Sequence, residues 1–208
     1  MPLSARQIVS GNEEWFTDSN SVRPEPAKIL LIEEGLEISS PKESDANELY
    51  YKVDENRAYL RKWLPWLDDV VSVDDELSMI RNLSENKDHQ RTYLIRLDGA
   101  IVGVVSMNWV DWNNRSFGIG YWISQESSGK GIVTKACSRL IEHCFSDLGL
   151  HRSVIEAAIH NNSSRAVAER LGMRLEGISK DREWLYDHFT DSAMYAITSP
   201  EWRNRNQS

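Results

Sequence analysis

The chain has 208 residues, enough for one domain with a substantial core, and its 32 acidic residues outnumber its 24 lysines and arginines to give a formal net charge of −8. This negative balance argues against binding to a nucleic-acid backbone and is compatible with a basic partner. No apolar run approaches the roughly 20 residues of a membrane span, and the amino terminus lacks the layout of a secretion signal, so we expect a cytoplasmic protein without a membrane partner.

The first part of the chain contains an irregular segment followed by a strand and a helix. Residues 1–27 show no hydrophobic period and contain several prolines, so we interpret them as an N-terminal arm. The run 28–38 alternates loosely and predicts a first strand. Ser40 and Pro41 then predict a helix, because serine is a favoured cap and proline is favoured at the first helical position.

The predicted helix runs into a corner that carries two tryptophans. Trp63 and Trp66 flank Pro65, where a helix must bend or end. The two indoles could belong to the core or could form one wall of a groove for an acceptor substrate. An acidic cluster follows at 68–76 and leads into a short helix predicted over 74–86. Such a cluster is typical of a solvated helix start, although it could also form an acidic lip that attracts a cationic substrate.

The middle of the chain predicts a sheet that changes from antiparallel to parallel. The runs 91–97, 100–110 and 117–123 are joined by short turns, which favours an antiparallel meander. The next apolar run, 152–159, follows a helix and therefore returns beside its predecessor as a parallel neighbour, through a right-handed crossover. At such a change the two neighbours can splay apart and leave unpaired backbone groups for an extended ligand.

The helix between the last two runs favours a bound phosphate at its start. It begins at Gly129-Lys130-Gly131 and ends at Gly149, with apolar residues at three-and-four spacing. The first N–H groups of a helix lack intrahelical partners and lie at the positive end of its dipole, so a glycine-rich entry lets an anion approach the backbone. The spacing does not fit a triphosphate loop, and Thr134 replaces the third glycine of a dinucleotide fingerprint, which leaves a dinucleotide oxidoreductase as a weak rival.

The end of the chain predicts a polar turn, a short helix and a final hairpin. The polar turn spans 160–165, the helix 165–171, and the hairpin carries Glu183 and Tyr195. Residues 199–208 are interpreted as a C-terminal tail. The two cysteines and five histidines show no ligand spacing, so no metal is expected.

Several of these motifs together resemble the GNAT superfamily of acetyl-CoA-dependent N-acetyltransferases. Within it, the chain is similar to the RimJ/RimL type, which acetylates the amino termini of ribosomal proteins. The resemblance covers roughly residues 29–198 and implies an acetyltransferase domain over 28–198. The matching segments are ESSGKG at 126–131, Asn161-x-x-Ser164, ERLGMRLEG at 169–177, NRAYLRKWLPW at 56–66 and Asp191-x-x-x-Tyr195.

The resemblance implies a fold, a co-substrate and a set of site residues. The fold is a single mixed α/β domain with a mostly antiparallel sheet of about seven strands, splayed between the fourth and fifth, and about four flanking helices. Acetyl-CoA is the implied co-substrate, and a second copy of the chain is a candidate partner in a homodimer. The implied cofactor-binding residues are Trp122, Ile123, Ser128, Gly129, Lys130, Gly131, Ile132, Val133, Asn161 and Ser164, and the implied acceptor-binding residues are Trp63, Trp66 and Tyr195.

Two positions depart from the superfamily pattern. Glu126 stands where a glutamine or arginine usually begins the pyrophosphate loop, so the loop could rely on backbone N–H groups and Lys130 instead. Ala168 stands where many members have a tyrosine that protonates the departing thiolate. The resemblance to the RimL branch implies that Ser164 takes this role as general acid.

The resemblance also implies that Glu183 is the general base, and the chemistry requires such a group. An ammonium has no lone pair, so a carboxylate must remove a proton, directly or through a water, before the amine can attack the thioester. Alternatives stay open for each residue: Ser164 could only cap a helix, Asn161 could only close a turn, Glu183 could be a surface residue and Tyr195 could be core.

The function expected from these observations is direct transfer of an acetyl group to a primary amine, most simply the N-terminal amine of a basic, ribosomal-type protein. Within the same chemistry, a small amine such as an aminoacyl-nucleotide antibiotic is the alternative acceptor, because a tryptophan corner could stack a ring. A non-catalytic acetyl-CoA-binding module is the alternative from a different class, and it is favoured by Glu126 and Ala168.

Overall fold

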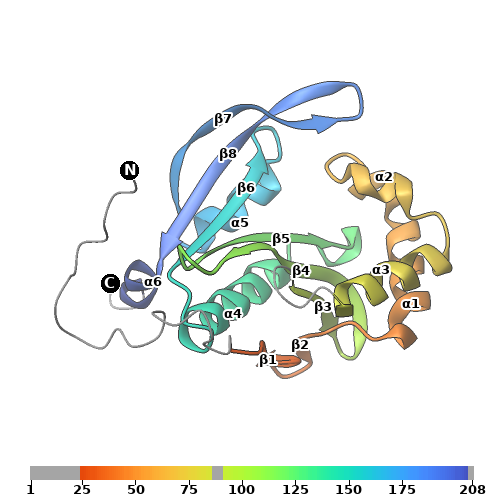
Figure 1. The fold of residues 1–208 in the computed structure, drawn as a ribbon. Helices are drawn as coiled ribbons and strands as arrows, with labels where there is room; N and C mark the ends of the chain where they lie inside the picture. The colour runs from red at the N-terminus through yellow and green to blue at the C-terminus, as the bar shows by residue number, and fades with distance from the viewer. Residues whose placement is uncertain (1–23, 86–90, 206–208) are drawn as a thin grey trace, which may run out of the picture.

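The computed structural model describes residues 24–85 and 91–205 and contains one eight-stranded sheet (Figure 1). The predicted arm therefore lies mostly outside the described residues. The strand order is β1-β2-β3-β4-β5-β6-β8-β7, and all neighbours are antiparallel except β5 and β6. The strands are β1 (Ile29–Glu33), β2 (Leu36–Ser39), β3 (Arg91–Leu97), β4 (Ala100–Asp111), β5 (Ser116–Ile123), β6 (Arg152–Ala158), β7 (Arg174–Leu185) and β8 (His188–Thr198).

Helices cover both faces of the sheet and create two hydrophobic cores. Alternate residues of β5 point to opposite faces: Phe117 and Ile119 pack with α4, whereas Trp122 packs with α1 and α3. Figure 1 shows α1, α2 and α3 gathered together, apart from α4. The helices are α1 (Ala46–Glu55), α2 (Arg57–Leu60), α3 (Val73–Glu85), α4 (Ile132–Ser146), α5 (Asn162–Arg170) and α6 (Ser199–Asn204), with 3-10 turns at Glu43–Asp45, Pro65–Asp69 and Gln125–Ser127.

The parallel pairing of β5 and β6 stops halfway along the strands. Ser116–Ile119 pairs with Arg152–Ile155, and beyond these residues β5 stays paired with β4 while β6 stays paired with β8. The two strands diverge visibly in Figure 1. The predicted splay is therefore confirmed, and it opens one edge of each strand at its carboxyl end.

The run predicted as one strand over 28–38 is a hairpin of two strands. Gly35 adopts φ +74° between β1 and β2, a conformation that favours glycine and reverses the chain. The predicted helix start at Ser40 is also wrong, because the Ser40 N–H still donates to the Lys28 carbonyl at 2.8 Å and extends the hairpin. The first helical turn begins at Glu43 instead, with Lys42 as its cap.

The residues predicted as a C-terminal tail are part of the domain. They form α6, in which Trp202 is buried, meets Phe145 edge-on and donates its indole N–H to Glu142 at 2.6 Å. The expected boundary at residue 198 therefore does not separate a tail from the core. This short helix docks against α4 because the apolar ring of Trp202 is buried there and its indole N–H finds an acceptor.

Gly103 of β4 controls how closely β5 can approach. A Cβ at this position would lie 2.3 Å from the Trp122 carbonyl oxygen and 3.0 Å from the Ile123 Cα, and neither backbone atom can move away without shifting β5. We expect Gly103→Ala to lower the free energy of unfolding by about 1–3 kcal/mol, as in other overpacked sites. In thermal denaturation, the melting temperature should decrease by roughly 2–4 °C for each kcal/mol of lost stability.

The matched control is Gly177→Ala in β7, where the added Cβ would meet none of the described residues within 4 Å. This variant should melt at or slightly above the wild-type temperature, because alanine restricts the unfolded chain. Equal melting temperatures for the two variants would contradict the proposed close approach at Gly103.

Candidate active site

The loop that precedes α4 exposes backbone N–H groups. Gly129 and Gly131 both adopt φ +76°, and α4 begins at Ile132. Gly131 is the N-cap and has no side chain with which to cap the helix. The first N–H groups of α4 therefore remain available to a ligand. Because this conformation strains other residues, the backbone requires glycines here. The loop thus has the exposed N–H groups that the predicted anion site requires.

Helix α1 holds this loop in place. The Asn56 side-chain oxygen accepts a hydrogen bond from the Gln125 N–H at 2.8 Å, and the Asn56 amide donates to the Lys52 carbonyl at 2.8 Å. The Lys52 ammonium also contacts the Glu126 carboxylate at 3.1 Å, and this hydrogen bond raises the pKa of Lys52. Glu126 is thus paired with α1, and the departure at this position does not place an unpaired charge in the loop.

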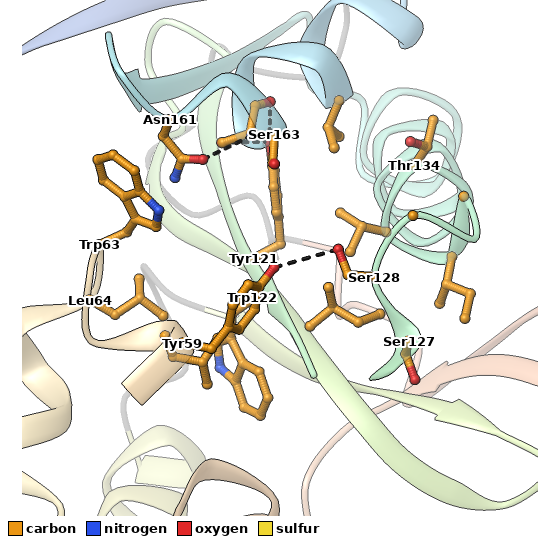
Figure 2. Close-up of a pocket in the computed structure, with 18 of the residues that line it drawn as sticks. Tyr59, Trp63, Leu64, Tyr121, Trp122, Ser127, Ser128, Thr134, Asn161 and Ser163 are labelled. Atoms are coloured by element: carbon orange, nitrogen blue, oxygen red, sulfur yellow. Dashed lines mark hydrogen bonds between the residues drawn. The ribbon is translucent and has the colours of Figure 1, made fainter. Parts of the chain in front are cut away.

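A first cavity of about 400 Å³ lies between this loop, the end of β5 and α5 (Figure 2). Nine of the ten residues predicted to bind the cofactor line it. Lys130, which is exposed, does not line it. The predicted residues that do line it are Trp122, Ile123, Ser128, Gly129, Gly131, Ile132, Val133, Asn161 and Ser164.

A second cavity of about 370 Å³ lies on the other side of the splay. Its walls come from β4, β5, β6, β7 and β8 and include Asn108, Trp109, Glu156, Arg182 and Glu183. Some residues line both cavities, which therefore meet between the open ends of β5 and β6. These shared residues are Trp63, Leu64, Tyr121, Asn161 and Ser164.

Ser164 lies at this junction and is paired with a phenol that sequence analysis missed. The Tyr121 hydroxyl lies 3.0 Å from the Ser164 carbonyl oxygen and 3.0 Å from Ser164 Oγ. When its single proton is donated to the carbonyl, the Ser164 hydroxyl is the donor of the second contact. Burial raises the pKa of Tyr121, so the phenol keeps its proton. Tyr121 was interpreted only as part of a strand, although its place near the end of a splayed strand was a usable signal.

Asn161, and not Ser164, caps α5. Its side-chain oxygen accepts the Ser164 N–H at 3.1 Å, and the helix begins at Asn162 instead of at the predicted Arg165. The alternative in which Ser164 serves only as a cap is therefore wrong. Ser164 instead lines both cavities, and its hydroxyl meets that of Tyr121.

Glu183 lines the second cavity beside another carboxylate and a guanidinium. Partial burial raises the pKa of Glu183 above its ordinary value; nearby Arg182 opposes this shift and Glu156 adds to it. The Arg182 Nε donates to Glu156 at 2.9 Å. Glu183 is thus a carboxyl with an increased proton affinity that solvent still reaches.

The three predicted acceptor-binding residues lie in three different places. Trp63 lines both cavities, and Figure 2 shows its ring beside Asn161. Trp66 lines a separate cavity beneath α1 and α3. Tyr195 is buried against α5, where its hydroxyl donates to Glu169 at 3.0 Å and accepts from Arg165 at 3.1 Å, so its position corresponds to the core alternative.

The described residues contain no cluster of three or more His, Cys, Asp or Glu side chains that could hold a metal ion. Within the same ranges, no helix has the length and apolar character that crossing a bilayer requires. Cys137 and Cys144 are buried free thiols of α4, and burial raises the pKa of both.

The chain matches known proteins over most of its length. A family model described as an acetyltransferase (GNAT) domain matches residues 36–174. The ribosomal-protein-serine acetyltransferase of Escherichia coli (strain K12) is 30% identical over 171 residues, which cover 81% of this chain and 96% of the relative.

Solved structures of similar enzymes share the fold. RimL, a ribosomal L7/L12 alpha-N-protein acetyltransferase in complex with coenzyme A, superposes with a TM-score of 0.79 and 29% identity over 82% of this chain and 97% of that chain. The microcin C7 self-immunity acetyltransferase MccE, in complex with acetyl-CoA and AMP, superposes with a TM-score of 0.77 and 30% identity over 80% and 94% of the two chains. Because the family model spans well over half of the sequence and the same fold recurs in these enzymes, the protein belongs to the GNAT acetyltransferase family.

Proposed function

We propose that the protein transfers the acetyl group of acetyl-CoA to a primary amine, and that this amine is the N-terminus of a ribosomal-type protein. The observation that carries the proposal is the meeting of two cavities at the splay, with Ser164 and Tyr121 at their junction. One cavity can take the coenzyme and the other the amine, which brings the two reactants together in a ternary complex.

The first cavity has the groups that coenzyme A requires. The uncapped N–H groups around Gly129 and Gly131 suit the pyrophosphate, with the positive end of the α4 dipole behind them. The edge of β5 beyond Ile119, left without β6, suits the extended diamide of the pantetheine arm. Asn161 lies beside that edge and can contact the same arm.

The second cavity has the groups that an amine requires. Glu183 can take a proton from the ammonium, and the free amine then attacks the thioester carbonyl, so that a C–N bond forms and the C–S bond breaks. Backbone N–H groups at the open end of β5 can stabilise the oxyanion. Ser164 can give its proton to the departing thiolate while the Tyr121 hydroxyl donates a hydrogen bond to the serine oxygen across the 3.0 Å contact. The proton that Glu183 took from the ammonium passes to solvent, and a proton from solvent restores the Ser164 hydroxyl.

The charges around the second cavity bear on the nature of the acceptor. The carboxylates of Glu156 and Glu183 and the net charge of −8 favour a cationic polypeptide. Such an acceptor would place the enzyme in the cytoplasm. The alternative, a small amine that carries a nucleotide, is favoured by the similarity to MccE and by Trp63, whose ring borders both cavities. The pairing of Ser164 with Tyr121 argues against a non-catalytic module.

A homodimer is also proposed, on the basis of the projecting β7–β8 hairpin. Trp184 and Phe189 are exposed there and stack edge-on with their ring centroids 4.9 Å apart, an arrangement typical of an interaction surface. Light scattering would test this, and a monomer at high concentration would exclude it.

The acceptor class can be tested with a panel of amines at fixed acetyl-CoA. We expect the wild-type enzyme to release coenzyme A with peptides that begin with a free α-amine, and mass spectrometry should place the acetyl group on that amine. Peptides that are already N-acetylated are the matched control and should not react. Turnover of an aminoacyl nucleotide, with no reaction of any peptide, would favour the alternative acceptor instead.

Glu183→Gln should lower kcat by roughly 10²–10⁴-fold and leave coenzyme A affinity nearly unchanged, because it removes only the proton acceptor. A base works in its deprotonated form, so wild-type kcat/KM should fall as the pH decreases through the raised pKa of Glu183. This acid limb should lie above the range of an ordinary glutamate and should disappear in the variant. Asp187→Asn, on the same hairpin, is the control and should retain the acid limb. If Glu183→Gln also retains the acid limb, Glu183 is excluded as the base.

Ser164→Ala and Tyr121→Phe should each lower kcat by about 10–100-fold, because each interrupts delivery of a proton to the thiolate. If the two hydroxyls act in one chain, the double variant should be hardly slower than the worse single variant. Ser163→Ala, a neighbouring hydroxyl that also lines the first cavity, is the control and should remain close to wild type. Strictly multiplicative losses in the double variant would show that the two hydroxyls act independently.

A further inference from the structure

A third cavity of about 220 Å³ lies between α1, α3 and strands β3, β4 and β5. It occupies the same face of the sheet as the second cavity, because Asn108 and Gly120 contribute to both. Most of its lining is apolar, and its titratable lining residues are Glu76 and Tyr121. The apolar part consists of Pro41, Leu49, Val53, Leu64, Trp66, Met79, Ile80, Leu83, Leu94, Val104 and Trp122.

Glu76 is the unexpected residue of this cavity. Glu76 is only 1% exposed, and its Oε2 has no hydrogen-bond partner among the described residues. The acidic cluster at the start of α3 was expected to be solvated, and Asp74 is exposed in agreement with that prediction. The partly exposed Asp75 accepts hydrogen bonds from the Ser72 hydroxyl and the Val71 N–H. Glu76 departs from the prediction, because it turns inward and burial raises its pKa to about 7.

A buried carboxyl without a partner is costly for the fold. Desolvation of a carboxylate is compensated only when a cation or hydrogen-bond donor meets it, and a leucine of similar volume would suit these apolar walls better. A residue that weakens the fold in this way is characteristic of a binding site. The missing partner is therefore expected to arrive with a ligand.

We propose that this cavity is a subsite of the acceptor that binds an alkylammonium group, with Glu76 as its counter-ion. This inference rests on the proposed acetyl transfer to an amine. The apolar walls match a methylene chain, the Glu76 carboxylate matches the terminal ammonium, and the Trp66 ring lines the same space and can contact a cation through its face. A cavity of about 150 Å³ holds benzene, so this larger one can hold a four-carbon chain.

The subsite is placed so that one acceptor can reach both carboxylates. The second cavity holds Glu183, and the third holds Glu76, with Leu64, Asn108, Gly120 and Tyr121 lining both. A Cβ on Gly120 would lie 2.4 Å from the Asn108 amide nitrogen, so the absence of a side chain there leaves room for the Asn108 side chain at the boundary of the two cavities. The amine to be acetylated would lie at Glu183, while a second, cationic group of the same acceptor extends to Glu76.

The first experiment compares lysine with norleucine in otherwise identical peptides. Each residue is placed at position 1, 2 or 3 of an alanine-based peptide with a free N-terminus, and kcat/KM is measured for acetylation of that terminus. At one position, the wild-type enzyme should prefer lysine by about 10-fold or more, because norleucine has the same chain without the ammonium. Glu76→Gln should reduce the ratio to about 2 or less.

The control variant is Asp69→Asn, which removes a negative charge from an exposed residue that does not line the cavity. This variant should keep the lysine preference. If it does, the preference comes from contact with Glu76 and not from long-range attraction between the lysine and the negative charge of the protein. Equal rates for lysine and norleucine at all three positions of wild type would overturn the subsite, while acetylation of both peptides would leave the proposed function intact. The pair 1,5-diaminopentane and n-pentylamine repeats the comparison for a small acceptor and distinguishes a diamine from a peptide.

The second experiment does not depend on turnover. Glu76→Leu should raise the melting temperature by a few degrees, because it removes an unpartnered buried carboxyl. Addition of 1,5-diaminopentane should raise the melting temperature of wild type and not that of the leucine variant. If no amine of any kind is acetylated, these melting temperatures still show whether the subsite binds an alkylammonium group. A lower melting temperature for Glu76→Leu, or an equal diamine shift in both proteins, would overturn the proposal.

Discussion

The site depends on the point at which parallel pairing between β5 and β6 ends. Each strand keeps its outer neighbour, β4 or β8, so both continue as ordered strands while the edge between them opens. Unpaired backbone groups are costly in a dry interior and inexpensive where a polar ligand or water can reach them. The splay therefore localises a small set of available donors and acceptors in a rigid frame. The first and second cavities and the junction between them follow from this one interruption.

Side chains from distant parts of the chain then complete the open edge. Asn56 fixes the loop from α1, Asn161 fixes the first turn of α5, and Tyr121 links β5 to that turn through Ser164. The contacts of Asn56 and Tyr121 join residues that lie 69 and 43 positions apart. The strands and helices that carry these residues are already fixed by the two cores. The polar groups thus need little reorganisation to meet a substrate, which is the condition under which fixed dipoles and hydroxyls assist a reaction most.

Much of the fold could be predicted because its signals are local. The strand over 91–97, the stop of α4 near Gly149 and the parallel crossover to β6 all follow from period, turn residues and connection length. The division of 28–38 was missed, because Gly35 looks like any glycine until its φ of +74° is known. The docking of α6 was missed for a different reason: the burial of Trp202 depends on Phe145 and Glu142, which lie far from it in sequence.

The candidate site was predictable where a residue type belongs to a motif and not where it gains its role from folding. The glycines of the α4 entry and the pair Asn161 and Ser164 are motif residues. Tyr121 looks like an ordinary strand aromatic, and its importance comes from a 3.0 Å contact with a residue 43 positions away. In the proposed mechanism, two hydroxyls answer the alanine at 168: Ser164 from the first turn of α5 and Tyr121 from β5, which lie 3.0 Å apart.

The two carboxyls of the proposed acceptor side, Glu183 and Glu76, differ in their contact with solvent. Glu183 has a raised pKa and stays within reach of solvent, so it can exchange protons between turnovers. Glu76 is buried in a mostly apolar cavity, where an unpaired charge is expensive and a paired one is strongly held. A carboxylate of the second kind discriminates sharply between ligands with and without a cation, because a wrong ligand leaves it buried and unpartnered. One domain can therefore use the same functional group to move a proton in one cavity and to select a substrate in the next.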